Sequence, residues 1–237
     1  FGGAASVLLR KPRSYGEVYN DRWDTVVNVF RVMRDPDLAK QLQEKLRLTP
    51  FARAEYEATG EEIISKVDDP VEKARLSILR SFAGFGSAAT NAKYATGFRA
   101  NSNRSGTTPA HDWVNYPQQI PWFIERLRGV VIENKDWKEI VDQHDSHETL
   151  FYLDPPYVHD TRNIKRGNAA YEYELSNQDH IDMCEKVKKL RGMVVISGYD
   201  NDIYNDLLPG WTIEKKEWLA DGAQKRVEVL WISPNCK

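Results

Sequence analysis

One stretch of the sequence decides the expected fold: Leu150-Phe151-Tyr152-Leu153-Asp154-Pro155-Pro156-Tyr157. Its first four residues are apolar or aromatic, which predicts a short buried strand. The strand runs into a turn that two prolines stiffen. Ligands of open α/β sheets bind beyond the carboxyl ends of the strands, so we expect the polar end of this stretch to carry the chemistry.

The tetrapeptide after the strand suits the binding of an aromatic amine such as that of adenine. The lone pair of this amine is delocalised into the ring, so the amine is a poor nucleophile. The Asp154 carboxylate and the Pro155 carbonyl can accept its hydrogens and aim its lone pair at a methyl donor. Pro155 and Pro156 hold both acceptors in place, and the Tyr157 ring offers a face on which an extruded base can stack. For the tetrapeptide alone, the alternative is an ordinary proline-rich turn.

Strands and helices alternate around this stretch in the second half of the chain. Strands are predicted at 130–132, 150–153 and 193–196, and helices at 136–141, 177–190 and 203–208. Two closing strands, at 211–218 and 226–232, are joined by a turn that contains Asp221-Gly222. We therefore expect an α/β fold with a mostly parallel sheet and an antiparallel carboxyl-terminal hairpin.

The first half predicts a short strand at 17–21 and then mostly helices. Apolar residues between Val26 and Met33 recur at helical spacing. Three later helices share one start signal, a small oxygen-bearing residue followed by proline. They are expected to begin at Asp35-Pro36, Thr49-Pro50 and Asp69-Pro70. The composition of 84–116 predicts a loop, and 116–128 predicts a further helix.

Composition excludes several classes of protein. The 237 residues are 41% hydrophobic and 29% charged, which is typical of a globular protein, and no apolar run is long enough to predict a membrane span. Cys184 and Cys236 lack metal-ligand spacing, which favours a reduced, cytosolic setting. Because the formal net charge is -2, any affinity for nucleic acid is expected to come from local positive charge.

A local concentration of positive charge exists between Lys73 and Ala110, a stretch without a single Asp or Glu. Its basic residues are the candidate DNA contacts: Lys73, Arg75, Arg80, Lys93, Arg99 and Arg104. Basic side chains suit phosphates, while Asn, Ser and Arg can read base edges. The alternative is a solvated loop whose charge bias carries no function.

Two other groups of residues are expected to have no chemical role. The first resembles a set of metal ligands but has no regular spacing, so we interpret it as a solvated polar link and predict no metal site. Its members are Asp142, His144, Asp145, His147 and Glu148. The second is the apolar side of a helix, which we assign to the core. Its members are His180, Met183, Cys184 and Val187.

Taken together, the motifs resemble the Dam-like adenine-specific (N6) DNA methyltransferases of bacteria and phages. Asp154-Pro155-Pro156-Tyr157 is the signature of that family. The other segments that resemble it follow in the order of the family: Phe1-Gly2-Gly3-Ala4-Ala5-Ser6-Val7, Asp21 with Val27-Asn28-Val29-Phe30, Asn134-Lys135-Asp136-Trp137, Val195-Ile196-Ser197-Gly198-Tyr199 and Arg226-Val227-Glu228-Val229-Leu230-Trp231.

The resemblance implies a Rossmann-like fold that binds S-adenosylmethionine, with an inserted region for DNA recognition. The catalytic domain would comprise 1–35 and 117–237, without its first strand, and the helical target-recognition insert 36–116. The implied catalytic residues are Asp154, Pro155, Pro156 and Tyr157. The implied cofactor contacts are Phe1, Gly2, Gly3, Asp21, Asp136, Trp137 and Asp154.

The resemblance further implies double-stranded DNA as partner, a monomer in the cytoplasm of a bacterial or phage-infected cell, and neither a metal nor a membrane. In the family, Asp21 would bind the ribose of the cofactor and Asp136 would lie near its adenine. A flipped adenine would then stack on Tyr157 and attack the methyl group in line.

Two departures from the family keep alternatives open. The family begins with a Gly-Gly-Lys segment and a strand that ends in Glu-Pro, whereas this chain starts at Phe1 on the glycine loop, so we expect it to be a piece of a longer reading frame. The second departure is Ala5, where many methyltransferases of this fold carry glycine. The alternatives are methylation of cytosine N4, of adenine in RNA or of a glutamine side chain, and a catalytically incompetent DNA-binding remnant.

Overall fold

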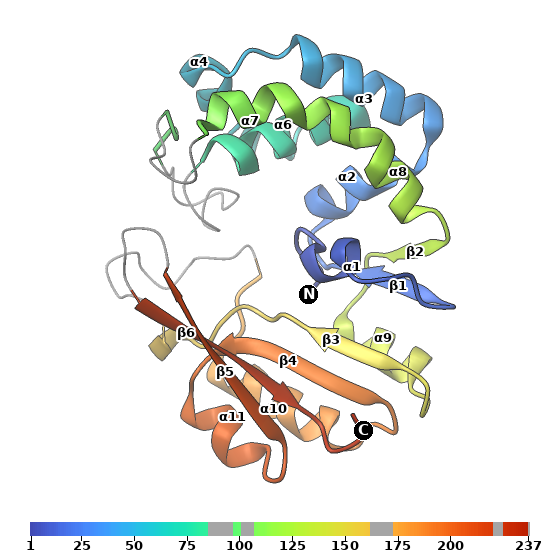
Figure 1. Ribbon diagram of the computed structural model, residues 1–237, viewed down its shortest axis with the longest axis vertical. Helices are drawn as coiled ribbons and strands as arrows, with labels where there is room; N and C mark the ends of the chain where they lie inside the picture. Colours follow the sequence, from blue (N-terminus) through green and yellow to red (C-terminus); the bar gives the residue numbers. More distant parts are fainter. Residues whose placement is uncertain (85–96, 101–106, 162–172, 220–224, 237) are drawn as a thin grey trace. The chain divides into compact units, whose positions relative to one another are not determined.

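The computed structural model describes residues 1–84, 97–100, 107–161, 173–219 and 225–236. They form two compact units. Unit 1 comprises Phe1–Gly2 and Lys135–Lys237, and unit 2 comprises Gly3–Asn134. Each unit has its own sheet and its own hydrophobic core (Figure 1).

Unit 2 is built from helices and one two-stranded parallel sheet. The sheet pairs β1 (Glu17–Asn20) with β2 (Val130–Glu133), and α1 (Ser6–Arg10) precedes it. The connection between the two strands contains the remaining helices of the unit. These are α2 (Asp24–Arg34), α3 (Pro36–Leu48), α4 (Arg53–Glu57), α5 (Glu61–Ile64), α6 (Pro70–Ala83), α7 (Pro109–Asn115), the 3-10 turn Tyr116–Gln119 and α8 (Ile120–Leu127).

Two of the three predicted helix starts are confirmed. Asp35 and Asp69 each accept hydrogen bonds from backbone N–H groups in the first turn of α3 and α6. The third predicted start is wrong, because Thr49 instead ends α3, where its hydroxyl donates to the carbonyl of Lys45 (2.7 Å). The next helix, α4, begins at Arg53.

A helix also forms within the segment predicted as a loop. Residues 85–96 and 101–106 lie outside the described residues, but α7 spans Pro109–Asn115. Its start has the same signal as α3 and α6: Thr108 accepts from the N–H of His111 (3.2 Å) and Pro109 is the first helical residue. The loop prediction is therefore wrong for these residues. It was based on the small polar residues around them, although the sequence also contains the Thr108-Pro109 helix start.

The helices predicted as a separate insert share one hydrophobic core with their surroundings. Leu42 of α3 and Leu79 of α6 belong to the same buried cluster as Val27 of α2 and Val130 of β2. The compact unit extends over residues 3–134, and the division into a catalytic domain and an insert at 35/36 and 116/117 stays a prediction. The physical reason for the extent of the unit is the sharing of apolar surface, because α2 and α6 bury their apolar sides against each other.

Unit 1 is an α/β arrangement with a four-stranded mixed sheet in the order β3-β4-β6-β5. The strands are β3 (Leu150–Leu153), β4 (Met193–Tyr199), β5 (Thr212–Leu219) and β6 (Lys225–Ile232). The helical elements are α9 (Trp137–His144), the 3-10 turn His159–Thr161, α10 (Asn177–Val187) and α11 (Asp202–Leu207). β3 and β4 are parallel, and β6 is antiparallel to both β4 and β5, so the predicted closing hairpin is present.

The two faces of this sheet differ in what they contact. Phe151 and Leu153 of β3 pack with residues of α9, α10 and α11 in the core of unit 1, which include the predicted core residues Met183, Cys184 and Val187. Leu150 and Tyr152 alternate with them and are exposed. The side chain of Asp154, two residues beyond Tyr152, therefore lies at the end of the strand on the side opposite this core.

The polar link before β3 has a structural role in part. The carboxylate of Asp145 accepts hydrogen bonds from the backbone N–H groups of Arg191 (2.9 Å) and Gly192 (2.9 Å), at the entry to β4. Desolvation raises the pKa of Asp145, but these two bonds and the hydrogen bond and charge of the Arg191 side chain outweigh it and hold the pKa below its usual value. Among the described residues, no His, Cys, Asp or Glu cluster could hold a metal ion.

Replacement of Gly192 by alanine should destabilise unit 1 by about 1–3 kcal/mol through overpacking. A Cβ at Gly192 would lie 2.8 Å from the Thr149 carbonyl oxygen and 3.0 Å from that of Ser146, and backbone atoms move only at a cost. Thermal unfolding checks the prediction, with Gly16→Ala as the control because nothing lies within 4 Å of its Cβ position. Equal melting temperatures for the two variants would contradict it.

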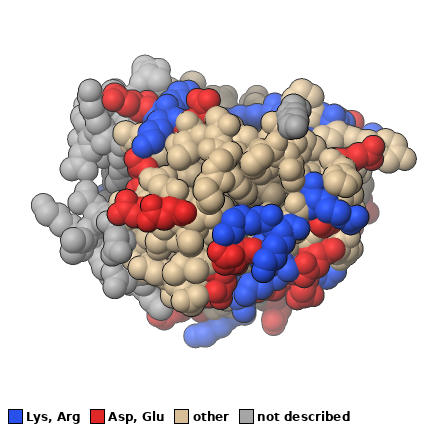
Figure 2. Space-filling model, turned by 90° about the horizontal axis from the view of Figure 1, so that it is seen from below, with Lys and Arg blue, Asp and Glu red and all other residues tan. Residues whose placement is uncertain are grey.

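Positive and negative charges are interspersed on the surface. Figure 2 shows one face on which Lys and Arg side chains lie beside Asp and Glu side chains. Ion pairs such as Lys186–Asp142 (2.6 Å) and Lys188–Glu185 (2.6 Å) account for part of this pattern in unit 1. No helix in the described part of the chain is long and apolar enough to cross a bilayer.

Candidate functional site

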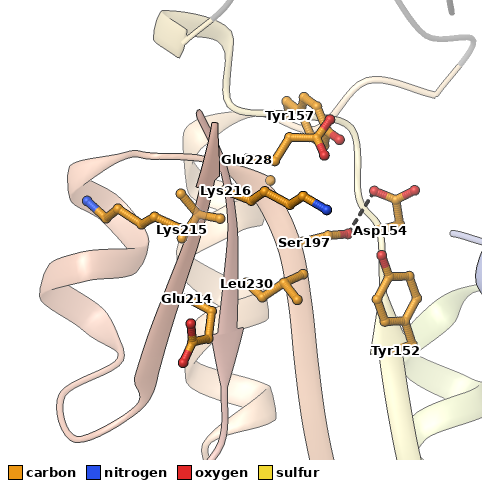
Figure 3. A pocket seen from close by; sticks show the side chains of 11 residues that line it. Tyr152, Asp154, Tyr157, Ser197, Glu214, Lys215, Lys216, Glu228 and Leu230 are labelled. Atoms are coloured by element: carbon orange, nitrogen blue, oxygen red, sulfur yellow. Dashed lines mark hydrogen bonds between the residues drawn. The ribbon is translucent and has the colours of Figure 1, made fainter. Parts of the chain in front are cut away.

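The pairing of β3 with β4 brings two polar residues together at the carboxyl ends of these parallel strands. Leu153 pairs with Ile196, so the next residues along the two strands are Asp154 and Ser197. The Ser197 hydroxyl donates a hydrogen bond to Oδ1 of Asp154 (2.9 Å), as Figure 3 shows, and it lies 3.3 Å from the Leu153 carbonyl oxygen. A hydrogen bond to a carboxylate is charge-assisted, so it fixes the orientation of that carboxylate more firmly than a neutral bond would.

The tetrapeptide separates buried from accessible groups. Pro155 and Pro156 are buried, Asp154 is exposed and Tyr157 is half-buried. The rings of Tyr157 and Tyr199 form an edge-to-face pair with centroids 4.5 Å apart. The prolines therefore anchor the turn while the carboxylate stays accessible, and Tyr199 at the end of β4 supports the Tyr157 ring.

An open cavity of about 540 Å³ surrounds this carboxylate on one face of the sheet. Residues of all four strands line it, together with the turn after β3 (Figure 3). They include Tyr152, Asp154, Tyr157, Ser197, Glu214, Lys216, Glu228 and Leu230. In Figure 3 the Lys216 ammonium group and the Tyr152 hydroxyl both point toward Asp154 and Ser197. The cavity thus combines a carboxylate, an ammonium group and aromatic surface.

Tyr152 stays protonated in this setting. Partial burial raises the pKa of its hydroxyl, a hydrogen bond with Ser197 opposes this effect, and the negative charges of Asp154 and Glu228 raise the pKa further. A protonated tyrosine is a hydrogen-bond donor, so the cavity presents a donor hydroxyl close to the Asp154 carboxylate.

Sequence reasoning missed several residues of this cavity. Lys216 of β5 pairs with Glu228 of β6, and Glu228 also pairs with Tyr199 of β4. Alternation along β6 could have placed Glu228 and Leu230 on one face. The partner of each residue could not be predicted, because the register of a hairpin depends on the geometry of its turn, which residue types alone do not specify.

The cofactor residues predicted in unit 2 are close to one another. Oδ2 of Asp21 accepts a hydrogen bond from the Gly3 N–H (2.9 Å), and the Tyr19 hydroxyl donates to the Gly3 carbonyl (2.8 Å). Gly3 has φ 47°, and no heavy atom lies within 4 Å of its Cβ position. Ala5 also has a positive φ, 55°, a conformation that favours glycine. The glycine loop is therefore tied to the acid after β1 while part of its backbone stays open.

The cofactor residues predicted in unit 1 form a second group. The rings of Phe1 and Trp137 have centroids 5.9 Å apart, and Gly2 belongs to the same unit. Asp136 is the N-cap of α9, where its carboxylate accepts from the Lys138 N–H (2.9 Å). This bond gives Asp136 a structural role that the sequence had not assigned.

The basic residues predicted to bind DNA have different surroundings. Arg75 is mostly buried and forms ion pairs with Glu72 (2.6 Å) and Glu55 (3.3 Å). Arg80 is 6% exposed and donates to the Thr59 carbonyl (2.8 Å). Both guanidinium groups are thus engaged within unit 2, and we remove them from the expected DNA contacts.

For the other four basic residues, contact with DNA stays a prediction. The Arg99 guanidinium lies 5.7 Å from the ring centroid of Phe82. Lys73 is half-buried on α6. Lys93 and Arg104 lie outside the described residues.

A family model matches residues 1–221 and describes D12 class N6 adenine-specific DNA methyltransferases. The chain belongs to this family. It is therefore an adenine-specific DNA methyltransferase that takes its methyl group from S-adenosylmethionine. The predicted family, reaction and methyl donor are confirmed, and methylation of cytosine, RNA or glutamine is not the activity of this family. No curated protein matches the chain.

Proposed function

We propose that this methyltransferase binds and activates its target adenine through Asp154, Pro155, Pro156 and Tyr157. The observation that carries the proposal is the exposed Asp154 carboxylate, which faces the cavity at the end of β3 and accepts a hydrogen bond from Ser197. An amine needs two acceptors to become pyramidal, and Asp154 with the Pro155 carbonyl supplies them. The two buried prolines keep these acceptors at a fixed separation.

The adenine is flipped out of duplex DNA and stacks on Tyr157. The edge-to-face contact with Tyr199 fixes the orientation of the Tyr157 ring, so less side-chain entropy is lost when a base binds. As the nitrogen gains the methyl carbon, the bond between that carbon and sulfur breaks, and the amine becomes acidic. The Asp154 carboxylate need not be a strong base, because it accepts a proton that is already leaving.

S-adenosylmethionine supplies the methyl group on a sulfonium, which activates it for displacement. In unit 2 the residues fit the ribose of this cofactor: Asp21 follows a parallel strand, borders an open glycine, and its two oxygens are oriented by the N–H groups of Gly3 and Trp23. The remaining proposed contacts are Phe1, Gly2, Asp136, Trp137 and Asp154.

The same proposal covers the fold family, the region that recognises DNA, the oligomeric state and the cell in which the enzyme acts. The units are parts of a Rossmann-like methyltransferase, consistent with their parallel strand pairs. Residues 36–116 recognise DNA, with Lys73, Lys93, Arg99 and Arg104 as the candidate phosphate contacts. The enzyme acts as a monomer in a bacterial or phage-infected cell.

Tyr157 variants test the stacking of the base. Tyr157→Ala should lower the rate of methyl transfer by about 10- to 100-fold, because base–aromatic stacking contributes about 1–3 kcal/mol. Tyr157→Phe keeps the ring and should stay within about threefold of the wild type. The measurement is incorporation of labelled methyl groups into methylation-free DNA, with the modified nucleoside identified after digestion.

A fluorescent base distinguishes stacking from a general loss of activity. 2-Aminopurine at the target position, once the recognition sequence is known from modification-sensitive sequencing, reports extrusion by a rise in fluorescence. Tyr157→Ala should give a larger rise than the wild type, because the extruded base loses the ring that quenches it. Unchanged fluorescence and an unchanged transfer rate in this variant would contradict the proposed role of Tyr157.

A further inference from the structure

Asp154 is held by a residue from a different strand, and this contact defines the geometry of the site. Ser197 is 9% exposed, and its hydroxyl carries a single hydrogen. Its hydrogen-bond partners include Asp154 Oδ1 at 2.9 Å, the Leu153 carbonyl at 3.3 Å and the Tyr152 hydroxyl. The carboxylate is the charged acceptor among them, so the hydrogen goes to Oδ1.

We propose that Ser197 is a positioning residue for methyl transfer: its hydroxyl orients the Asp154 carboxylate toward the adenine amine. This inference rests on the proposed role of Asp154. A carboxylate offers about four acceptor positions, so a bond from Ser197 to Oδ1 leaves acceptor capacity for the amine. An anion that receives a hydrogen bond is stabilised relative to its neutral form, so the bond also favours the charged acceptor.

The surroundings of this pair strengthen the case for a positioning role. Asp154 shares the cavity with Glu228, a like charge, and with Lys216 of β5, whose ammonium group points toward Asp154 and Ser197, while the Ser197 hydroxyl contacts the carboxylate directly (Figure 3). The backbone next to Ser197 is also tightly packed, because a Cβ at Gly198 would lie 3.3 Å from the Trp231 ring. The backbone that carries Ser197 is thus held in place, and its hydroxyl is directed at Asp154 by the 2.9 Å hydrogen bond.

Ser197→Ala is the decisive variant. The loss of a hydrogen bond to a charged group should lower kcat by about 10- to 100-fold. KM for DNA should change by less than about threefold, because the side chain makes its contact with Asp154 rather than with the phosphates. The acidic limb of the kcat profile should move upward, because the carboxylate loses a stabilising donor.

Two further variants separate positioning from stability. Ser197→Thr keeps the hydroxyl and should restore most of kcat and the original pH profile. Ser233→Ala is the matched control, since Ser233 is a buried serine of the same unit whose hydroxyl accepts from the Val194 N–H (2.9 Å). This control should lose stability without a change in kcat or in the pH profile.

The inference would be overturned if Ser197→Ala kept kcat within twofold of the wild type, or if its acidic limb stayed in place. It would equally be overturned if Ser233→Ala lost kcat and shifted the limb to the same extent. The proposed function fails in a different way, namely if Asp154→Ala remains active. If Asp154→Ala were inactive and Ser197→Ala fully active, only the positioning role of Ser197 would be contradicted, and the proposed role of Asp154 would stand.

Discussion

Asp154→Ala should lower the rate of methyl transfer by about a thousandfold while the protein stays folded. The carboxylate is exposed at the end of β3, so its removal leaves no cavity in the core, and the cost in stability should stay below about 1 kcal/mol. The loss of rate follows from chemistry, because the amine keeps its lone pair in the ring unless two acceptors draw its hydrogens away. One of those acceptors would be gone.

Asp154→Asn refines the expectation. An amide oxygen can still accept one hydrogen from the amine, but it carries no charge and cannot take the proton that leaves. The variant should therefore fall between the wild type and Asp154→Ala. In both variants, binding of S-adenosylmethionine measured by calorimetry shows whether the loss lies in chemistry or in cofactor affinity.

The control for both variants is Asp202→Ala. Asp202 is an exposed acid in the first turn of α11. Its replacement should leave the transfer rate unchanged. Activity of Asp154→Ala within tenfold of the wild type, at equal melting temperature, would exclude Asp154 as the acceptor.

The strand and turn that contain the tetrapeptide were predictable because their signal is local. An apolar strand followed by Asp154-Pro155-Pro156-Tyr157 specifies both the element and the edge on which it ends. The helix caps at Asp35 and Asp69 were predictable for the same reason, since each needs only the next few residues. Thr49 carries the same local signal, but its hydroxyl bonds backward to Lys45 and ends a helix instead. The identity of a capping residue alone does not decide between these two outcomes.

Contacts between distant residues were not predictable. Arg75 belongs to a stretch without acidic residues, but both of its ion-pair partners lie outside that stretch. Glu72 comes just before it, and Glu55 lies on α4. Ser197 and Asp154 are 43 positions apart, and only the register of β3 against β4 joins them. A single sequence shows which residues are charged or polar. It does not show which of them the packing pairs internally and which it leaves for a ligand.

The largest effect on stability is expected at a buried ion pair in unit 2. Arg126 of α8 donates to both oxygens of Glu17 on β1 (2.7 and 2.9 Å) and to the Leu8 carbonyl of α1 (2.5 Å). Burial on its own raises the pKa of Glu17, but hydrogen bonds from Arg126 and Lys11 outweigh it and lower the pKa to about 2. The hydrogen bonds of Arg126 therefore connect α8 with β1 and α1.

Arg126→Ala should destabilise unit 2 by about 3–5 kcal/mol, because it leaves Glu17 buried without its main partner. The effect depends on pH in a defined direction. The folded pKa of Glu17 lies below its usual value of 4.5, so its ionised form contributes stability above about pH 5 and loses that contribution as the pH falls toward 2. The difference between wild type and variant should accordingly be largest near neutrality and shrink in acid.

Hydrogen exchange of the backbone amides of β1 and β2, followed in urea, measures this difference within unit 2 itself. Arg128→Ala is the matched control: Arg128 follows α8 directly, and its exposed side chain pairs with Glu125 (3.1 Å), so its loss should cost less than about 0.5 kcal/mol. A difference between Arg126→Ala and wild type that stayed constant from pH 7 to pH 3 would mean that the stability comes from the packing of the arginine. A difference that shrinks in acid would assign it to the ion pair with Glu17, because the stability that ionised Glu17 contributes is lost as the pH falls below its unfolded-state pKa of 4.5, whereas groups common to both proteins cancel in the difference.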